Sequence, residues 1–254
     1  MSGGRLPGGV AVLVTCEHGG NRVPAAWAPL FAEAAGVLPT HRGWDPGALS
    51  LARELARILR APLRSATVSR LLVDLNRSPH HPRVFSEWPR GLPQAERAEL
   101  LARYHAPHRD AVEADVAEQV RRGRRVVHLG VHSFTPVLDG KVRRAELALL
   151  YDPRRPLERA LCSAWADGLA RALRHLAVRR NQPYRGASDG LTTWLRRRFP
   201  AEAYLGIEIE VNQRLLGPAG RFPSEIGAAL AACLRSAVAP SSPAPPGGSL
   251  SRRR

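Results

Sequence analysis

Residues 10–21, VAVLVTCEHGGN, decide the fold, because an apolar run rich in β-branched residues stops there at a group of polar ones. The near-continuous apolar stretch Val10–Thr15 predicts a strand that is buried on both faces, as central strands of parallel sheets are. His18 follows this strand, and the two glycines after it let the backbone turn tightly and leave the imidazole uncrowded. We therefore expect His18 at the edge of a sheet, where it is available for chemistry.

Three further apolar runs stop at, or contain, groups that can bind a metal, a carboxylate or a proton. They are Leu71–Val73 before Asp74–Arg77, Val126–Val131 before His132 and Ser133, and Leu205–Val211 with Glu208 and Glu210 inside it. In an open α/β sheet, the loops at the carboxyl ends of parallel strands converge on one crevice. The pattern predicts an enzyme whose site is built from residues far apart in the sequence.

Hydrophobic periodicity predicts strands that alternate with helices. The expected strands or extended segments are Val10–Thr15, Leu63–Val68, Arg70–Val73, Arg125–Val131, Glu146–Tyr151 and Tyr204–Val211. The expected helices are Pro46–Leu59, Glu96–Arg122 with a break or kink near Pro107, Leu157–Leu176, Gly190–Arg198 and Ser224–Val238. This alternation favours an α/β fold, a three-layer α/β/α sandwich with a mostly parallel mixed sheet.

A chain of 254 residues with 44% hydrophobic content can fill the core of one large domain. We expect a flexible N-terminus at 1–8, a single domain at 9–238 and a disordered Pro/Ser/Arg-rich tail at 239–254. The proline-rich stretch Ser78–Pro93 has no periodicity, so it is expected to be a long loop of the kind that forms lids or walls.

The formal net charge of +16 raises nucleic acid as a partner. Only Lys141 among the 38 basic residues is a lysine, however, so arginine stands where other proteins would use lysine. The runs Arg121–Arg125 and Arg196–Arg198 fall at the ends of predicted helices, where cations complement the negative end of the helix dipole. Solvated helix faces are therefore favoured over a polyanion site, and a small molecule over nucleic acid as the partner.

The three cysteines, Cys16, Cys162 and Cys233, are odd in number and widely separated, so they describe neither a disulfide framework nor a zinc knuckle. A reducing cytoplasm fits them best. The N-terminus lacks a hydrophobic signal core, and no stretch approaches the ~18 apolar residues of a spanning helix. We expect a cytoplasmic protein without a membrane partner, and no feature predicts its oligomeric state.

The two strand-end histidines suggest a metal. His18 and His132, together with one carboxylate, would make a three-ligand zinc site that keeps an open position for water. Asp45 is the leading candidate for the carboxylate, although Asp before Pro46 is also an ordinary N-cap. Glu17 competes, but adjacent residues on an extended segment point to opposite faces, so Glu17 and His18 need a turn to face one ion.

Asp74-Leu75-Asn76-Arg77 is suited to holding a substrate carboxylate. The planar fork of Arg77 offers two parallel hydrogen bonds, and Asn76 can donate another. The alternative is that Asp74 and Arg77 form a surface ion pair, which contributes little. Arg70 either adds positive potential for substrate binding or pairs with Asp74.

Glu208 and Glu210 share a parity, so both side chains face the same side of a regular strand. One of them beside a metal would act as a general base. The alternative is an edge strand with one solvated face. The other histidines, His80, His81, His105, His108 and His128, are expected to be structural or loop residues; Trp88, Trp194 and the segment 183–186 either line the pocket or pack on the surface.

Five motifs in order resemble the N-formylglutamate amidohydrolase family over residues 10–215. They are VLVTCEHGGNRVP (12–24), DPGA (45–48), SRLLVDLNR (69–77), VHSF (131–134) and IEVNQ (209–213). The resemblance implies a fold like those of zinc carboxypeptidases and aspartoacylase, a phosphorylase/hydrolase-like sandwich. It also implies zinc-dependent hydrolysis of the amide bond of N-formylglutamate or a related N-acyl amino acid.

The same resemblance implies His18 and His132 as zinc ligands, Asn76 and Arg77 as the substrate clamp, and Glu210 as the base that serves a zinc-bound water. Carboxypeptidase-like relatives have a ligand Glu three residues after the first His, but here that position is Asn21. The third ligand is therefore open between Asp45, Glu17 and Asn21. Two alternative functions remain, a zinc peptidase or amidase acting on short peptides and an Arg-rich nucleic-acid-binding protein with a vestigial site.

Overall fold

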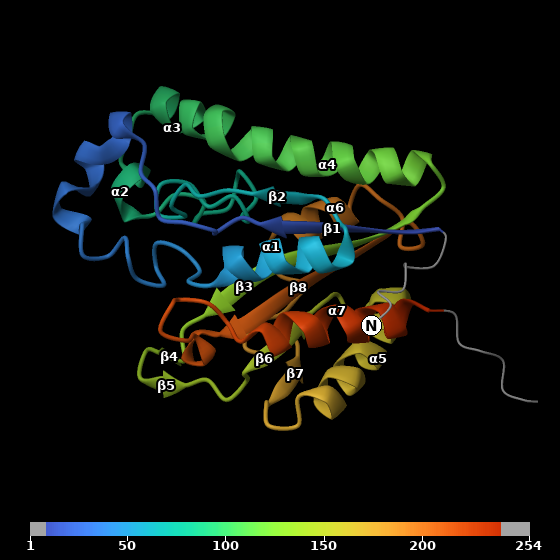
Figure 1. Cartoon of the computed structure of the whole chain (residues 1–254). Coiled ribbons are helices and arrows are strands. Elements are labelled where there is room, and N and C mark those ends of the chain that lie inside the picture. Colours follow the sequence, from blue (N-terminus) through green and yellow to red (C-terminus); the bar gives the residue numbers. More distant parts are fainter. Residues whose placement is uncertain (1–8, 240–254) are drawn as a thin grey trace, which may run out of the picture.

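The computed structural model describes residues 9–239, and Figure 1 shows one sheet with helices packed against it. Its strands are β1 (Val10–Cys16), β2 (Leu63–Ser65), β3 (Arg125–Phe134), β6 (Leu147–Leu150), β7 (Val178–Arg180) and β8 (Tyr204–Asn212). Their order across the sheet is β2-β1-β3-β8-β6-β7. Strands β2, β1, β3 and β8 are parallel, and β6 is antiparallel to β8. The predicted mixed, mostly parallel sheet is confirmed.

The remaining elements are α1 (Ala48–Leu59), α2 (Glu87–Arg90), α3 (Gln94–Leu100), α4 (Ala106–Arg121), α5 (Pro156–Ala172), α6 (Leu191–Arg196), α7 (Ser224–Val238), the hairpin of β4 (Val137–Leu138) and β5 (Lys141–Val142), and the short helical segments η1 (Ala25–Ala34), η2 (Leu101–His105) and η3 (Gln213–Leu215). The predicted flexible terminus 1–8 and the predicted tail, apart from Ala239, lie outside the described residues. No helix among residues 9–239 is long and apolar enough to cross a membrane.

The two faces of the sheet are covered by different helices, which confirms the three-layer prediction. Alternate side chains of β8, from Leu205 to Val211, pack in one apolar cluster with residues of α1, α5 and α7. Tyr204, of the opposite parity, packs with residues of α4 and α6 in a second cluster. Figure 1 shows α1 and α7 in front of the strands and α6 behind them. Each buried Leu or Ile contributes about 1.5–3 kcal/mol, so these faces fix the strand register.

The parity of β8 places Glu208 and Glu210 on the same face as Tyr204. Strand β8 lies between β3 and β6, with His132 opposite Glu210 in the β3–β8 register. The edge-strand alternative for the two glutamates is therefore wrong. Both carboxylates belong to the interior of the sheet, at the carboxyl end of a central strand.

The prediction that Arg70–Val73 is extended is wrong, because this segment forms turns in which the amide of Leu72 donates to the carbonyl of Ser69. Its apolar residues pack with Trp27 and Phe31 of η1 in a third cluster that lies outside the sheet. A short apolar run is buried equally well by a strand or by a packed loop. Strand β2 likewise ends at Ser65, short of the predicted Val68.

The long helix predicted for Glu96–Arg122 is interrupted before Pro107, at the π-helical segment η2. Pro107 lies in the first turn of α4, where its missing N–H costs no hydrogen bond. Helix α1 begins at Ala48, after a cap at Gly47, two residues later than predicted. The loop predicted for Ser78–Pro93 contains α2, and η1, β4, β5 and β7 had no counterpart in the sequence-based expectations.

The two arginine runs, 121–125 and 196–198, differ in their exposure to solvent. Arg121 and Arg122 pair with Glu118 on the surface of α4, as the helix-face prediction expects. The side chain of Arg196 is only 5% exposed, and its Nε donates to Glu158 Oε1 at 3.0 Å, so that prediction is wrong for Arg196. A buried guanidinium needs a carboxylate partner, and Glu158 supplies it.

Candidate active site

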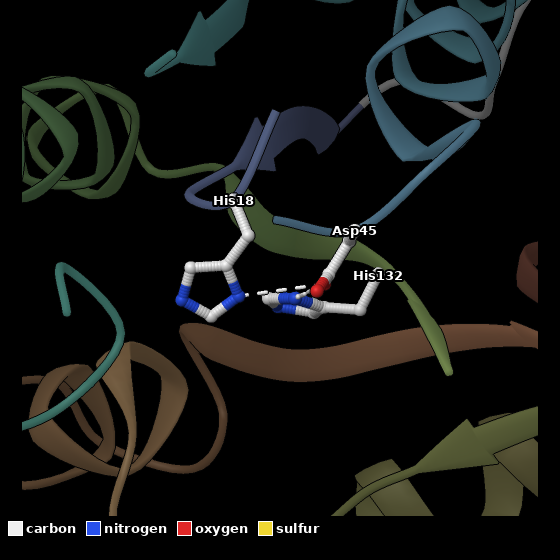
Figure 2. Close-up of side chains that lie close together, drawn as sticks. All are labelled: His18, Asp45 and His132. Carbon is white, nitrogen blue, oxygen red and sulfur yellow. Dashed lines mark hydrogen bonds and ion pairs between the residues drawn. The ribbon is translucent and has the colours of Figure 1, made fainter. Parts of the chain in front are cut away.

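Three side chains from separate segments point toward one another at the carboxyl end of the sheet (Figure 2). His18 follows β1, His132 lies near the end of the neighbouring strand β3, and Asp45 comes from the loop before α1. The amide of Asp45 donates to the carbonyl of His18 at 2.9 Å, which fixes this loop beside β1. The sequence-predicted histidines are therefore brought together, and Asp45 is with them.

Two of the distances between the candidate donor atoms are close to those of a tetrahedral metal site. Asp45 Oδ2 lies 3.4 Å from His18 Nδ1 and 3.0 Å from His132 Nδ1. Ligands about 2.0–2.2 Å from a tetrahedral zinc ion lie roughly 3.4 Å from one another. All three residues are buried, and two imidazoles with one carboxylate are a donor set that zinc favours. The residues present therefore fit a zinc ion.

The other ring nitrogen of each histidine faces a second carboxylate. His18 Nε2 lies 2.7 Å from Asp74 Oδ1, and His132 Nε2 lies 3.3 Å from Glu17 Oε2. Such carboxylates fix the orientation of metal-binding imidazoles and raise their basicity. Glu17 thus faces the far nitrogen of His132, on the side away from Asp45, and Asn21 instead donates to the carbonyl of Leu38.

The charges at this site shift its titrations. Burial lowers the pKa of His132, but the nearby carboxylates of Asp45 and Glu17 outweigh it and raise that pKa well above its usual value. Burial and Arg70 lower the pKa of His18, yet Asp74 and Asp45 leave it raised. Burial raises the pKa of the Asp45 carboxyl, but the imidazoles dominate and hold it below its usual range. Without a metal, each imidazole therefore binds its proton more tightly than a free histidine does.

The N-cap alternative for Asp45 is wrong. Helix α1 is capped at Gly47, and no side chain there bonds to the first turn. The Asp45 carboxylate instead accepts hydrogen bonds from the two imidazoles, from Arg70 Nη1 at 3.3 Å and from the amide of Ser133 at 3.4 Å. All its contacts are directed into the site.

Glu208 and Glu210 face the same cavity but differ in their surroundings. Glu208 Oε1 accepts from Asn76 Nδ2 at 3.4 Å and from Thr192 Oγ1 at 3.5 Å. Glu210 is buried, and its Oε2 has no hydrogen-bond partner among the described residues. Burial, and then Asp45 and Glu208 against the opposing charge of His132, raise the pKa of Glu210 to about 8. Of the two glutamates, Glu210 is therefore the one whose carboxyl group is free to accept or donate a proton.

The loop 74–77 reaches the same cavity. Asp74 is buried and pairs with Arg70 Nη2 at 2.9 Å as well as with His18, so the surface pair of Asp74 with Arg77 is wrong. The ion pair of Arg70 with Asp74 is the pairing alternative expected for Arg70, and Arg70 also contacts Asp45. Arg77 Nη1 donates to the carbonyl of Asp189 at 3.0 Å, and its guanidinium lines the cavity.

The cavity has a volume of about 260 Å³, which suits a small molecule. Its walls combine the residues named above with a segment between β7 and α6. This lining comprises His18, Asp45, Arg70, Asn76, Arg77, His132, Ser133, Leu150, Tyr184, Arg185, Ser188, Asp189, Glu208 and Glu210. The wall expected from Ser78–Pro93 is therefore supplied by residues 184–189, and neither Trp88 nor Trp194 lines this cavity.

The family model for N-formylglutamate amidohydrolase matches residues 10–216, a range that contains every residue of this cavity. The chain belongs to the N-formylglutamate amidohydrolase family. It is therefore an amidohydrolase, as the sequence predicted. A search of curated proteins found no match.

Two solved structures resemble this N-formylglutamate amidohydrolase family member along nearly its whole length. The crystal structure of gene product Atu2144 from Agrobacterium tumefaciens is 31% identical, with 93% of this chain and 96% of that chain covered and a TM-score of 0.75. N-formylglutamate amidohydrolase from Ralstonia eutropha JMP134 is 23% identical, with 92% and 93% covered and a TM-score of 0.60. At 23% identity, the similarity to the Ralstonia eutropha enzyme shows a shared fold.

Helix α4 contributes to this amidohydrolase site in a way that the sequence analysis missed. His108 Nε2 lies 3.3 Å from Glu17 Oε1, so it holds the carboxylate that faces His132. Arg109 Nη1 donates to the carbonyls of residues 75–77, and His105 Nε2 bonds the carbonyl of Arg77. The spacing 105, 108, 109 puts all three side chains on one helix face, which was the available signal.

Proposed function

We propose that this amidohydrolase uses a zinc ion, held by His18, Asp45 and His132, to hydrolyse the amide bond of N-formylglutamate or a closely related N-acyl amino acid. One observation supports it above the others. Three donor atoms that could hold a metal meet in the same small cavity as Glu210, whose Oε2 has no hydrogen-bond partner, and Arg77, which has no carboxylate partner among residues 9–239. Metal-assisted hydrolysis of the amide bond of an acidic substrate would use all three.

A bound zinc ion would supply polarisation of the acyl carbonyl and a lowered pKa for a water molecule. Glu210 accepts the proton from that water and passes it to the leaving nitrogen, a role for which a carboxyl group with a pKa near neutrality is suited. Asp74 and Glu17 keep the two imidazoles in one orientation from behind. The protein thus supplies the group that accepts the proton and fixes the orientation of the residues around it.

The substrate carboxylate binds to Arg77, whose planar fork fixes its orientation. Asn76 lines the cavity beside it, and its amide is itself fixed, because Asn76 Oδ1 accepts from the amide of Leu191 at 2.7 Å. Arg70 contributes positive potential while it pairs with Asp45 and Asp74. This arrangement orients the scissile amide toward the metal-binding residues.

The proposal is tested with purified protein loaded with one equivalent of zinc. Formate release from N-formyl-L-glutamate is measured beside release of acid from N-acetylated amino acids and cleavage of short peptides. We expect the wild-type protein to hydrolyse the N-formyl or N-acyl amino acid, and we expect this activity to be lost in His132→Ala. Cleavage of peptides with no turnover of N-acyl amino acids would establish the peptidase alternative instead.

A further inference from the structure

Three arginines line the cavity, but they are not equally available to a ligand. Arg70 contacts Asp45 Oδ1 at 3.3 Å through Nη1 and Asp74 Oδ2 at 2.9 Å through Nη2. The guanidinium of Arg70 is therefore occupied by two protein carboxylates. Arg77 and Arg185 form no ion pair within residues 9–239, so two positive charges in one small cavity are available to an anionic ligand.

The backbone that carries Arg185 is held firmly. The side chain of Asn181 accepts from the amides of Tyr151 at 3.0 Å and Gly186 at 3.1 Å, so it ties the segment to the end of β6. Arg196 Nη1 donates to the carbonyl of Gly186 at 2.6 Å. A Cβ added at Gly186 would lie 2.1 Å from the nitrogen of Tyr151, so the backbone at Gly186 packs directly against the backbone of Tyr151 and leaves no room for a side chain. The backbone that carries Arg185 is therefore already ordered, and only the arginine side chain has to be ordered when it binds a ligand.

The two unpaired arginines both line the cavity beside the segment 184–189, because Arg185 belongs to this segment and Arg77 donates to the carbonyl of Asp189. At the Arg185 end, the chain packs against β6, where Gly186 contacts the backbone of Leu150 and Tyr151. At the other end, Asp189 accepts from Arg77 through its carbonyl and from the amide of Ser78 at 2.9 Å through its carboxylate. Both arginines therefore line the same cavity, and neither has a carboxylate partner among residues 9–239.

The carboxylates of the cavity do not neutralise these arginines. Asp189 accepts from the amide of Ser78, and Glu208 accepts from Asn76 and Thr192. Each is therefore occupied by uncharged donors of the protein. Glu210 forms no ion pair with Arg77 or Arg185 among residues 9–239.

We propose that Arg185 is the specificity-determining residue for a second carboxylate of the substrate, so that the site selects N-acyl amino acids with an acidic side chain over their neutral isosteres. The inference rests on the proposed function for its substrate class. Arg77 holds one carboxylate of such a substrate and Arg185 holds the other. Each arginine presents a planar fork that matches a carboxylate in two hydrogen bonds.

The test compares N-formyl-L-glutamate with N-formyl-L-glutamine, which has the same size and lacks the second charge, in the zinc-loaded enzyme. Arg185→Met should lower kcat/KM for the glutamate substrate by about 10- to 100-fold, as the loss of a charged hydrogen-bonded contact does. The glutamine substrate should change by less than about threefold, because it makes no ion pair. Arg179→Met, on the exposed strand β7, is the matched control and should alter neither value.

Binding of both compounds is also measured by calorimetry in wild type and Arg185→Met, so that the result does not depend on turnover. If Arg185→Met loses affinity equally for the two compounds, or for neither, the role of Arg185 is overturned. If wild type still hydrolyses the substrate in that case, the proposed function stands. No hydrolysis in wild type, with tighter glutamate binding that vanishes in Arg185→Met, supports the role of Arg185 and contradicts the proposed function. Absence of both hydrolysis and binding preference overturns both.

Discussion

At the scale of single residues, the two glutamates of β8 show what a strand pattern can and cannot predict. Their shared parity correctly placed Glu208 and Glu210 on one face, in one cavity. The choice between them depends on neighbours from other segments, because Asn76 and Thr192 donate to Glu208 and no described group donates to Glu210 Oε2. Partners that come from distant parts of the chain leave no trace in the local sequence.

Replacing the general base should reduce turnover without loss of the metal. Glu210→Gln keeps the volume and removes the proton acceptor, so kcat should fall by about 10²- to 10⁴-fold while zinc content stays at the wild-type level. Glu208→Gln is the matched control on the same strand and should lose less than about tenfold. Formate release and metal analysis of both variants check this, and a greater loss in Glu208→Gln would reverse the assignment.

The raised pKa of Glu210 also predicts a pH dependence of stability in metal-free protein. The carboxyl pKa is about 8 in the folded state and about 4.3 in an unfolded chain, so the folded state binds the proton more tightly. Stability therefore falls as pH rises from about 4.3 to about 8, and the cost is complete above that range. The stability advantage of Glu210→Gln over wild type should be greater near pH 8.5 than near pH 5, by about 1 kcal/mol or more.

Thermal unfolding in the presence of a chelator measures this difference. One kcal/mol corresponds to about 2–4 °C in Tm for a protein of this size. A Tm difference between Glu210→Gln and wild type that does not change between pH 5 and pH 8.5 would contradict the burial of an ionisable Glu210.

At the scale of elements, the sheet was predictable and the loops that complete the site were not. The continuous apolar runs of β1, β3 and β8 identified these strands, and with them the positions of His18, His132 and Glu210. The run Leu71–Val73 has the same composition but is buried against η1 by packing of a loop. Local apolarity reports burial, whereas the element that achieves it depends on segments elsewhere in the chain.

Helix α4 should determine the position of the substrate-binding loop through Arg109. The guanidinium is buried and donates to the carbonyls of residues 75–77, so Arg109→Met removes this donor from all three, while the carbonyl of Arg77 keeps its bond with His105. The free energy of unfolding should fall by about 2–3 kcal/mol, and kcat/KM by about tenfold or more as Arg77 is displaced. Arg121→Met, at the exposed end of α4, should change both quantities little.

Denaturant unfolding and steady-state kinetics provide the two readouts for Arg109→Met. A stability loss without any change in kcat/KM would show that the loop keeps its position without α4. Unchanged values in both measurements would contradict the bracing role altogether.

At the scale of the whole molecule, the fold gathers carboxylates around two imidazoles at one edge of the sheet. Asp45, Asp74 and Glu17 all contact His18 or His132, and together they leave both imidazole pKa values raised. A metal binds only the neutral imidazole, so zinc binding should release protons. The metal-free site holds these protons more tightly than free histidines do.

Calorimetric titration of metal-free protein with zinc in buffers of different ionisation enthalpy measures that release. We expect a linear dependence that corresponds to release of about one to two protons per zinc near pH 7. The release should decline at higher pH, as the imidazoles lose their protons before the metal arrives. An apparent enthalpy that is the same in all buffers would contradict protonated imidazoles in the metal-free site.

The central claim, a catalytic zinc ion held by His18, Asp45 and His132, is tested most directly by restoring activity to chelator-treated protein. We predict that formate release from N-formyl-L-glutamate is lost with the metal and returns in proportion to added zinc, up to one equivalent. Asp45→Asn should bind zinc at least about 10- to 100-fold more weakly, since it lacks the only carboxylate of the donor set. Full activity without metal, or wild-type zinc affinity in Asp45→Asn, would contradict the account.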